Sequence, residues 1–125
     1  MKKGVLIFWL VLLLVIVGGV GASFMAGNQP NKLDSFAQCI KSKGVVFYGA
    51  FWCPHCQKTK AMFGTATQYL PYVECSTSDG QHQTQVCKDA GIESYPTWTL
   101  PATTTRLTGE HTLEELSTFS GCPLP

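Results

Sequence analysis

Residues 45–56 read VVFYGAFWCPHC, and they carry the strongest structural signal in the sequence. Its first half, 45–50, is rich in β-branched and aromatic residues, which is typical of a buried strand. Pro54 begins a helix directly afterwards, because proline fits the first helical turn, where a missing N–H group costs nothing. The sequence therefore predicts that Cys53 and Cys56 stand at a junction between a strand and a helix.

The position of the two cysteines predicts thiol–disulfide exchange. Unpaired amide groups and the dipole at a helix N-terminus favour negative charge, so they stabilise a thiolate at Cys53. Cys56 lies one turn further along the helix and close enough to bond back, which makes Cys53 the nucleophile and Cys56 the resolving thiol. A protonated His55 adds to this stabilisation and makes the disulfide a stronger oxidant, whereas the alternative is an exposed spacer.

Three other interpretations of the cysteine pair stay open. It can be a static structural disulfide. It can be half of a zinc site, although the chain has no second C-x-x-C and its other histidines, His82 and His111, lack ligand spacing to the pair. It can attach a c-type haem, although Gln57 stands where that site needs histidine. We expect no metal and no cofactor.

Hydrophobic spacing and turn residues predict the remaining elements. We expect helices at 34–42, 81–90 and 112–119, and a further helix that starts at Pro54 and breaks or kinks at Gly64. We expect strands at 45–50, 72–75, 97–100 and 103–107, and the last two strands are expected to pair with each other. Thr112 and Glu115 have the spacing of a capping box. The order α-β-α-β-α-β-β-α predicts the α/β class, with a mixed central sheet flanked by helices.

The first 26 residues are set apart from this domain as a membrane anchor or a signal peptide. Lys2 and Lys3 precede an uncharged stretch, 4–26, and about 20 apolar residues suffice to cross a bilayer. The positive-inside tendency keeps the N-terminus cytoplasmic and sends the rest across. We favour a single-pass transmembrane helix. A signal peptide cut after Ala22 remains the alternative, because small residues follow the strongest apolar run.

The exported part comprises a linker at 27–32 and one domain at 33–125. Nine Lys and Arg oppose eight Asp and Glu, and two of the nine are Lys2 and Lys3. No basic stripe stands out, so we expect no nucleic-acid partner. All six cysteines lie in the exported domain, and an even number predicts disulfides on the extracytoplasmic, periplasmic or external, side.

From Leu33 onwards the chain resembles the thioredoxin-like domain that is fused to, or encoded beside, bacterial and plant homologues of vitamin K epoxide reductase. The matching stretches are FYGAFWCPHCQKTKAMFG at 47–64, LPYVECS at 70–76 and CKDAGIESYPTW at 87–98. The tetrapeptide CPHC is also that of DsbA-like periplasmic oxidases. The resemblance implies a thioredoxin-like fold.

The resemblance also implies a function and further site residues. Such domains oxidise the dithiols of exported client proteins, and a membrane partner passes the electrons to quinone. This chain has one hydrophobic segment, so that vitamin K epoxide reductase-like partner must be a separate protein. Pro96 is implied to be the cis-proline that faces the dithiol and exposes backbone to an extended substrate, and an ordinary trans proline at the start of an edge strand is the alternative. A structural bond is implied between Cys75 and Cys87, with a second redox pair as the alternative.

Reducing thioredoxins usually carry a buried acid six residues before the first active cysteine, where this chain has Phe47. That departure favours a dithiol oxidase over an extracytoplasmic reductase or isomerase, and a non-catalytic binding module is the third alternative. By elimination Cys39 and Cys122 pair with each other, or they are free thiols or contact a partner. Most of the aromatic run is expected in the core, and Trp52 either joins it or caps the active site.

Overall fold

The computed structural model describes residues 2–26, 31–101 and 103–125, and the chain divides into two compact units, 1–30 and 31–125. The first unit holds α1, Lys2–Ala26. Its large apolar side chains between Val5 and Val17 are exposed. Within the described residues, no helix has the length and apolar character that crossing a membrane requires, so the predicted transmembrane helix is not found.

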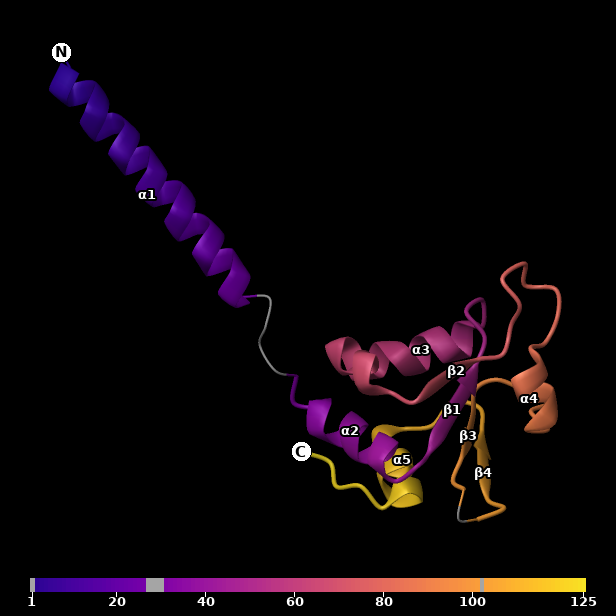
Figure 1. The fold of residues 1–125 in the computed structure, drawn as a ribbon. Coiled ribbons are helices and arrows are strands. Elements are labelled where there is room, and N and C mark those ends of the chain that lie inside the picture. Colours follow the sequence, from indigo (N-terminus) through magenta and orange to yellow (C-terminus); the bar gives the residue numbers. More distant parts are fainter. Residues whose placement is uncertain (1, 27–30, 102) are drawn as a thin grey trace. The chain divides into compact units, whose positions relative to one another are not determined.

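The second unit is an α/β domain (Figure 1). Its helices are α2 (Asp34–Ser42), α3 (Pro54–Phe63), the 3-10 helix η1 (Gly64–Tyr69), α4 (Gln85–Asp89) and α5 (Leu113–Ser120). Its strands are β1 (Val46–Gly49), β2 (Tyr72–Glu74), β3 (Thr97–Thr99) and β4 (Arg106–Thr108). Gly64 ends α3 at a φ of 54°, and the predicted capping box of Thr112 and Glu115 begins α5.

The four strands form one mixed sheet in the order β2-β1-β3-β4. The central strand β1 runs parallel to β2 and antiparallel to β3, while β3 and β4 are antiparallel. Phe47 is paired with Tyr72 on one side and with Trp98 on the other. The predicted mixed sheet with flanking helices is confirmed, and so is the pairing of the last two strands.

Neighbouring residues of β1 face opposite sides of the sheet, as the pleat requires. Phe47 is fully buried in the larger core, where its ring stacks on Trp98 at 4.3 Å between centroids. Tyr48 instead packs against the smaller core of Cys75, Cys87 and Ile92. Helices α2, α3 and α5 therefore lie on one face and α4 on the other (Figure 1). Cys53 and Cys56 belong to the larger core.

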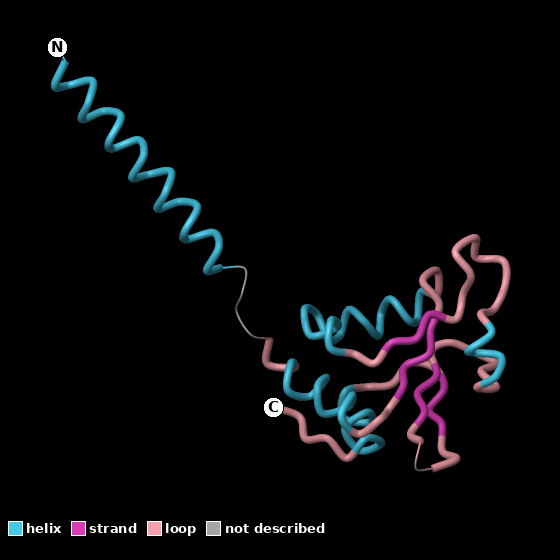
Figure 2. Tube along the Cα trace, in the orientation of Figure 1, coloured by secondary structure: helices cyan, strands magenta, loops and turns pink. Residues whose placement is uncertain are grey.

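Two elements differ from the sequence prediction because backbone groups find other partners. The helix expected at 81–90 begins only at Gln85, since Gln83 forms a bridge with Ser76 and the Thr84 amide donates to the Cys75 carbonyl at 2.8 Å. The long loop that precedes α4 is visible in Figure 2. The strand expected at 103–107 is shifted to β4, because the Thr103 amide closes a turn on the Leu100 carbonyl at 3.0 Å.

The predicted linker also ends earlier than 32. The Asn31 side chain donates to the Phe63 carbonyl at 2.9 Å, and its oxygen accepts from the Leu33 amide at 3.0 Å. Asn31 thus joins the entrance of α2 to the end of α3 and belongs to the domain. The rest of that linker, 27–30, lies outside the described residues.

Two disulfides hold the domain together. Cys39 on α2 is bonded to Cys122 behind α5, over a sequence separation of 83. Cys75 behind β2 is bonded to Cys87 on α4, over a separation of 12. The first bond ties the two ends of the domain to each other, and the second fastens the short helix α4 to the sheet.

We expect the two bonds to contribute unequally to stability. In the chain-entropy description, a cross-link stabilises by restricting the unfolded chain, by about 4.5 kcal/mol for the longer loop and about 2.8 kcal/mol for the shorter one. Replacing Cys39 and Cys122 together by alanine should therefore lower the free energy of unfolding more than replacing Cys75 and Cys87. Urea titrations of both double variants measure the difference, and equal losses would contradict it.

Candidate active site

Cys53 caps the N-terminus of α3. Its backbone is extended, and its amide donates to the Ala50 carbonyl at 3.0 Å, which closes the turn that follows β1. The Cys56 amide donates to the Cys53 sulfur at 3.4 Å. The sulfur thus takes the place of the side-chain oxygen at an ordinary N-cap, where a helix leaves amide groups unpaired and favours negative charge.

Cys56 is buried behind Cys53. Only 1% of Cys56 and 4% of Cys53 is exposed, and both are free thiols in this structure. Burial, together with the hydrogen bond to Cys53, raises the pKa of Cys56 to about 12. Cys56 therefore keeps its proton at neutral pH, and any reaction in which its sulfur attacks must first remove that proton.

The loop that contains Pro96 lies against this thiol pair. The Tyr95–Pro96 peptide bond is cis, and the Cys53 thiol donates to the Tyr95 carbonyl at 3.8 Å. The Pro96 carbonyl accepts from the Gly109 amide at 2.8 Å, which fixes the loop to the end of β4. The structure thus brings Pro96 to the Cys53–Cys56 pair, although Pro96 lies far from both cysteines in the sequence.

Gly49 at the end of β1 lets α3 approach the sheet. A β-carbon at this position would lie 2.8 Å from the Cε2 atom of Tyr72 and 3.0 Å from the Cys56 sulfur. Both distances are too short for any side chain larger than hydrogen without movement of the neighbours. Glycine at this position is therefore required for the Cys56 sulfur to pack against β1 and the Tyr72 ring.

His55 is exposed, and its partner comes from a distant loop. Its Nδ1 atom lies 2.5 Å from Glu110 Oε1, and Lys58 forms an ion pair with the other oxygen of the same carboxylate. The hydrogen bonds from His55 and Lys58 hold the pKa of Glu110 below its usual range. Glu110 is therefore ionised at neutral pH and links the tetrapeptide 53–56 and Lys58 to the segment before α5.

Glu74, the last residue of β2, and Ser76, just behind that strand, hold the loop that precedes Cys53. Glu74 accepts from the Phe51 amide at 3.2 Å and from the Ser76 amide at 2.8 Å through the same oxygen. The Trp52 indole donates to the Ser76 hydroxyl at 2.9 Å. The turn between β1 and α3 is thus tied to the neighbouring strand, which fixes the approach to the Cys53 sulfur.

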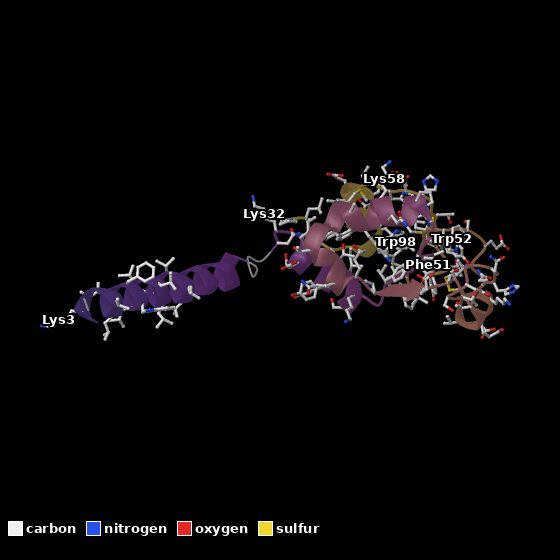
Figure 3. All side chains as sticks on the ribbon, turned by 90° about the horizontal axis from the view of Figure 1, so that it is seen from above. Lys3, Lys32, Phe51, Trp52, Lys58 and Trp98 are labelled. Atoms are coloured by element: carbon white, nitrogen blue, oxygen red, sulfur yellow. A yellow bond between two sulfur atoms is a disulfide. The ribbon has the colours of Figure 1, made fainter. Side chains whose placement is uncertain are left out.

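Phe51 and Trp52 leave about half of their surface in solvent, with exposures of 49% and 50%. This differs from the prediction that most of the aromatic run is core, since only the part within β1 points inward. Trp98 lies inside the domain, whereas the other two rings lie toward its surface (Figure 3). The Trp52 ring meets Tyr95 edge-on at 6.1 Å between centroids, so it flanks the cysteine pair.

Sequence reasoning missed Glu110, Glu74 and Ser76 as parts of this site. Their contacts span 55, 23 and 24 positions along the chain, so no local spacing connects them to the cysteines. The one available signal for Glu74 was its place in the strand predicted at 72–75. Among the described residues, no group of three His, Cys, Asp or Glu side chains is arranged to hold a metal ion.

Comparison with known proteins gives the same picture of the domain. Residues 28–120 match the Thioredoxin family. The chain is also 40% identical over 94 residues to the thiol-disulfide oxidoreductase LTO1 of Arabidopsis thaliana, which covers 72% of this chain. The match spans only 24% of that plant protein. The family match covers most of the chain and includes the cysteine pair at the start of α3, and the chain therefore belongs to the thioredoxin family.

Proposed function

We propose that this chain is a thiol–disulfide oxidoreductase that introduces disulfides into exported proteins. The observation that carries the proposal is the environment of the Cys53 sulfur. It accepts a hydrogen bond from the Cys56 amide in the first turn of α3, and its thiol donates to the Tyr95 carbonyl. The plant relative is named for the same chemistry, which supports the reaction type. The clients would be proteins that expose a pair of thiols.

In the oxidising reaction, a client thiolate attacks Cys53 of the Cys53–Cys56 disulfide. The bond between the two cysteines breaks, and Cys56 leaves as a thiolate that takes up a proton. A second client thiolate then attacks the client sulfur of the mixed disulfide, which completes the client disulfide and releases Cys53 as a thiolate. Two electrons have passed from the client to the cysteine pair.

Several features support oxidation over reduction. Stabilising the thiolate of the reduced form makes the disulfide a stronger oxidant, and the Cys53 sulfur lies at a helix N-terminus with His55 and Lys58 in the first turns of that helix. Phe47, fully buried beneath the site, stands where reducing thioredoxins usually carry an acid. The site is therefore built to favour the reduced pair.

The proposal also includes the location of the domain and the protein that would reoxidise the cysteine pair. The Cys39–Cys122 and Cys75–Cys87 bonds are of the kind that persists in oxidising compartments, which supports an extracytoplasmic domain. The apolar, exposed side chains of α1 support a role for the N-terminal segment in export and membrane attachment. A separate quinone-linked membrane protein, similar to vitamin K epoxide reductase, would reoxidise the reduced pair.

Serine variants should separate the roles of the two thiols. Cys53→Ser should abolish exchange, because the attacked sulfur is gone. Cys56→Ser should instead accumulate mixed disulfides between Cys53 and client proteins, because no second thiol resolves them. Non-reducing gels of cells that express each variant measure the adducts, and equal trapping by both would overturn the assignment.

Thiol trapping of the unmodified chain in the same cells tests the direction. A cysteine pair that is mostly oxidised agrees with an oxidase, whereas a mostly reduced pair would indicate a reductase or isomerase. A pair that reacts with neither oxidants nor reductants would leave only a binding module.

His55 should tune the reduction potential. His55→Ala removes the imidazole that Glu110 contacts, and with it a group that stabilises the Cys53 thiolate of the reduced form when protonated. We expect the potential to fall by roughly 30 mV, a tenfold change in the exchange equilibrium, which makes a weaker oxidant. A glutathione redox titration measures this, with His82→Ala on an exposed loop as the control. An unchanged potential would show that His55 is a spacer.

The N-terminal segment should keep the domain at the membrane. Cell fractionation should recover the chain with the membranes, and mass measurement should find the N-terminus uncleaved. A mature chain that begins at Ser23 in the soluble fraction would show a cleaved signal peptide instead, without affecting the redox chemistry.

A further inference from the structure

Cys56 needs help to carry negative charge. Its sulfur is a thiolate whenever the bond to Cys53 is about to form or has just broken, yet burial and the neighbouring Cys53 raise the pKa of this thiol to about 12. Phe47, which is fully buried, offers no charge at the position where an acid would lie. The surroundings of Cys56 must therefore be searched for another group that acts on it.

Lys60 occupies a suitable position on the same helix. It follows Cys56 by four residues, and side chains at this spacing lie on one face of an α-helix. Its ammonium lies 3.3 Å from the centre of the Tyr72 ring, a cation–π contact that holds the charge in a half-buried place. Lys60 is thus directed toward the sheet beneath Cys56.

The Tyr72 ring connects Lys60 to the Cys56 sulfur. The ring atom Cε2 and the sulfur lie 2.8 and 3.0 Å from the same point, the place of a β-carbon on Gly49. The Tyr72 hydroxyl donates to Glu74 at 2.7 Å, and burial together with this carboxylate raises the pKa of Tyr72 above its usual range, so the ring stays neutral. The ring that binds the Lys60 ammonium therefore packs at the same point of β1 as the Cys56 sulfur.

The charges around Cys56 act in opposite directions. Cys53 raises the pKa of Cys56, while a backbone hydrogen bond at Ala50 and the positive charge of Lys60 lower it. Tyr72 is neutral, and the Glu74 carboxylate accepts hydrogen bonds from the Tyr72 hydroxyl and from the Phe51 and Ser76 amides. Among these groups Lys60 carries the positive charge that favours the Cys56 thiolate, and a substitution can remove that charge.

We propose that Lys60, held on the Tyr72 ring, stabilises the thiolate of Cys56 and thereby accelerates the formation and cleavage of the Cys53–Cys56 bond. The inference rests on the proposed exchange activity and holds for either direction of electron flow. When the bond forms, Cys56 loses its proton and attacks Cys53, and the sulfur bonded to Cys53 leaves as a thiolate. When the bond breaks, a thiolate attacks Cys53, and Cys56 leaves with the electron pair.

The two steps can be separated with the reduced full-length chain and an aromatic disulfide reagent that releases a coloured thiolate. Attack by Cys53 releases the first equivalent of colour and leaves a mixed disulfide. Attack by Cys56 on that mixed disulfide releases the second equivalent and forms the Cys53–Cys56 bond. Stopped-flow absorbance therefore reports the two cysteines as successive phases.

Lys60→Met, which keeps the length of the side chain but removes its charge, should slow the second phase by about threefold and leave the first phase unchanged. A tenfold smaller thiolate fraction slows the attack only about threefold, because a more basic thiolate is the better nucleophile. The pH profile of the second-phase rate should also shift toward higher pH. Lys60→Arg should restore the rate, since a guanidinium keeps the charge and stacks on an aromatic ring.

Lys41→Met, on the exposed side of α2, is the matched control for the loss of one positive charge and should leave both phases unchanged. A second phase of unaltered rate and pH dependence in Lys60→Met would overturn the inference, and so would an equal effect of Lys41→Met or failure of Lys60→Arg to restore the rate. If the wild-type chain gives no first phase, the proposed function itself fails. The two failures are thus distinguishable.

Discussion

The hydrogen bond from the Cys56 amide to the Cys53 sulfur is the contact on which the site depends. It makes the sulfur the cap of α3, so the reactive atom and the helix N-terminus coincide. This arrangement requires the helix to begin immediately after the strand, and Pro54 allows that because the first helical turn needs no amide hydrogen there. The rest of the domain holds this junction in place.

Close packing around Gly49 provides most of that support. Because glycine lacks a side chain, the Cys56 sulfur and the Tyr72 ring can both approach the end of β1. The same packing buries Cys56 and makes its thiolate unfavourable, which separates the chemical roles of two identical side chains by their surroundings. The surroundings of Cys56 therefore suit its proposed role as the resolving thiol, while Cys53 lies at the helix N-terminus.

The surface around the cysteine pair is assembled from three further segments. The turn before Cys53 is fastened to the end of β2 through Glu74 and Ser76, the Tyr95–Pro96 loop covers the sulfur, and Glu110 reaches His55 from the segment before α5. The Cys39–Cys122 bond joins the first and last helices of the domain on the face that also holds the cysteine pair. These contacts hold two half-exposed aromatic rings, those of Phe51 and Trp52, beside the Cys53–Cys56 thiol pair.

Local patterns in the sequence determined the elements of the domain and the chemistry of its centre. The β-rich run before Cys53, proline after it, and the capping residues Thr112 and Glu115 act over a few positions, so they can be read without a structure. The limits of α4 and β4 were misplaced, because Thr84 and Thr103 engage backbone groups elsewhere. The contacts of Glu110 with His55 and of Lys60 with the Tyr72 ring appear only in the folded domain, since they depend on how the sheet and helices pack and leave no periodic pattern in the sequence.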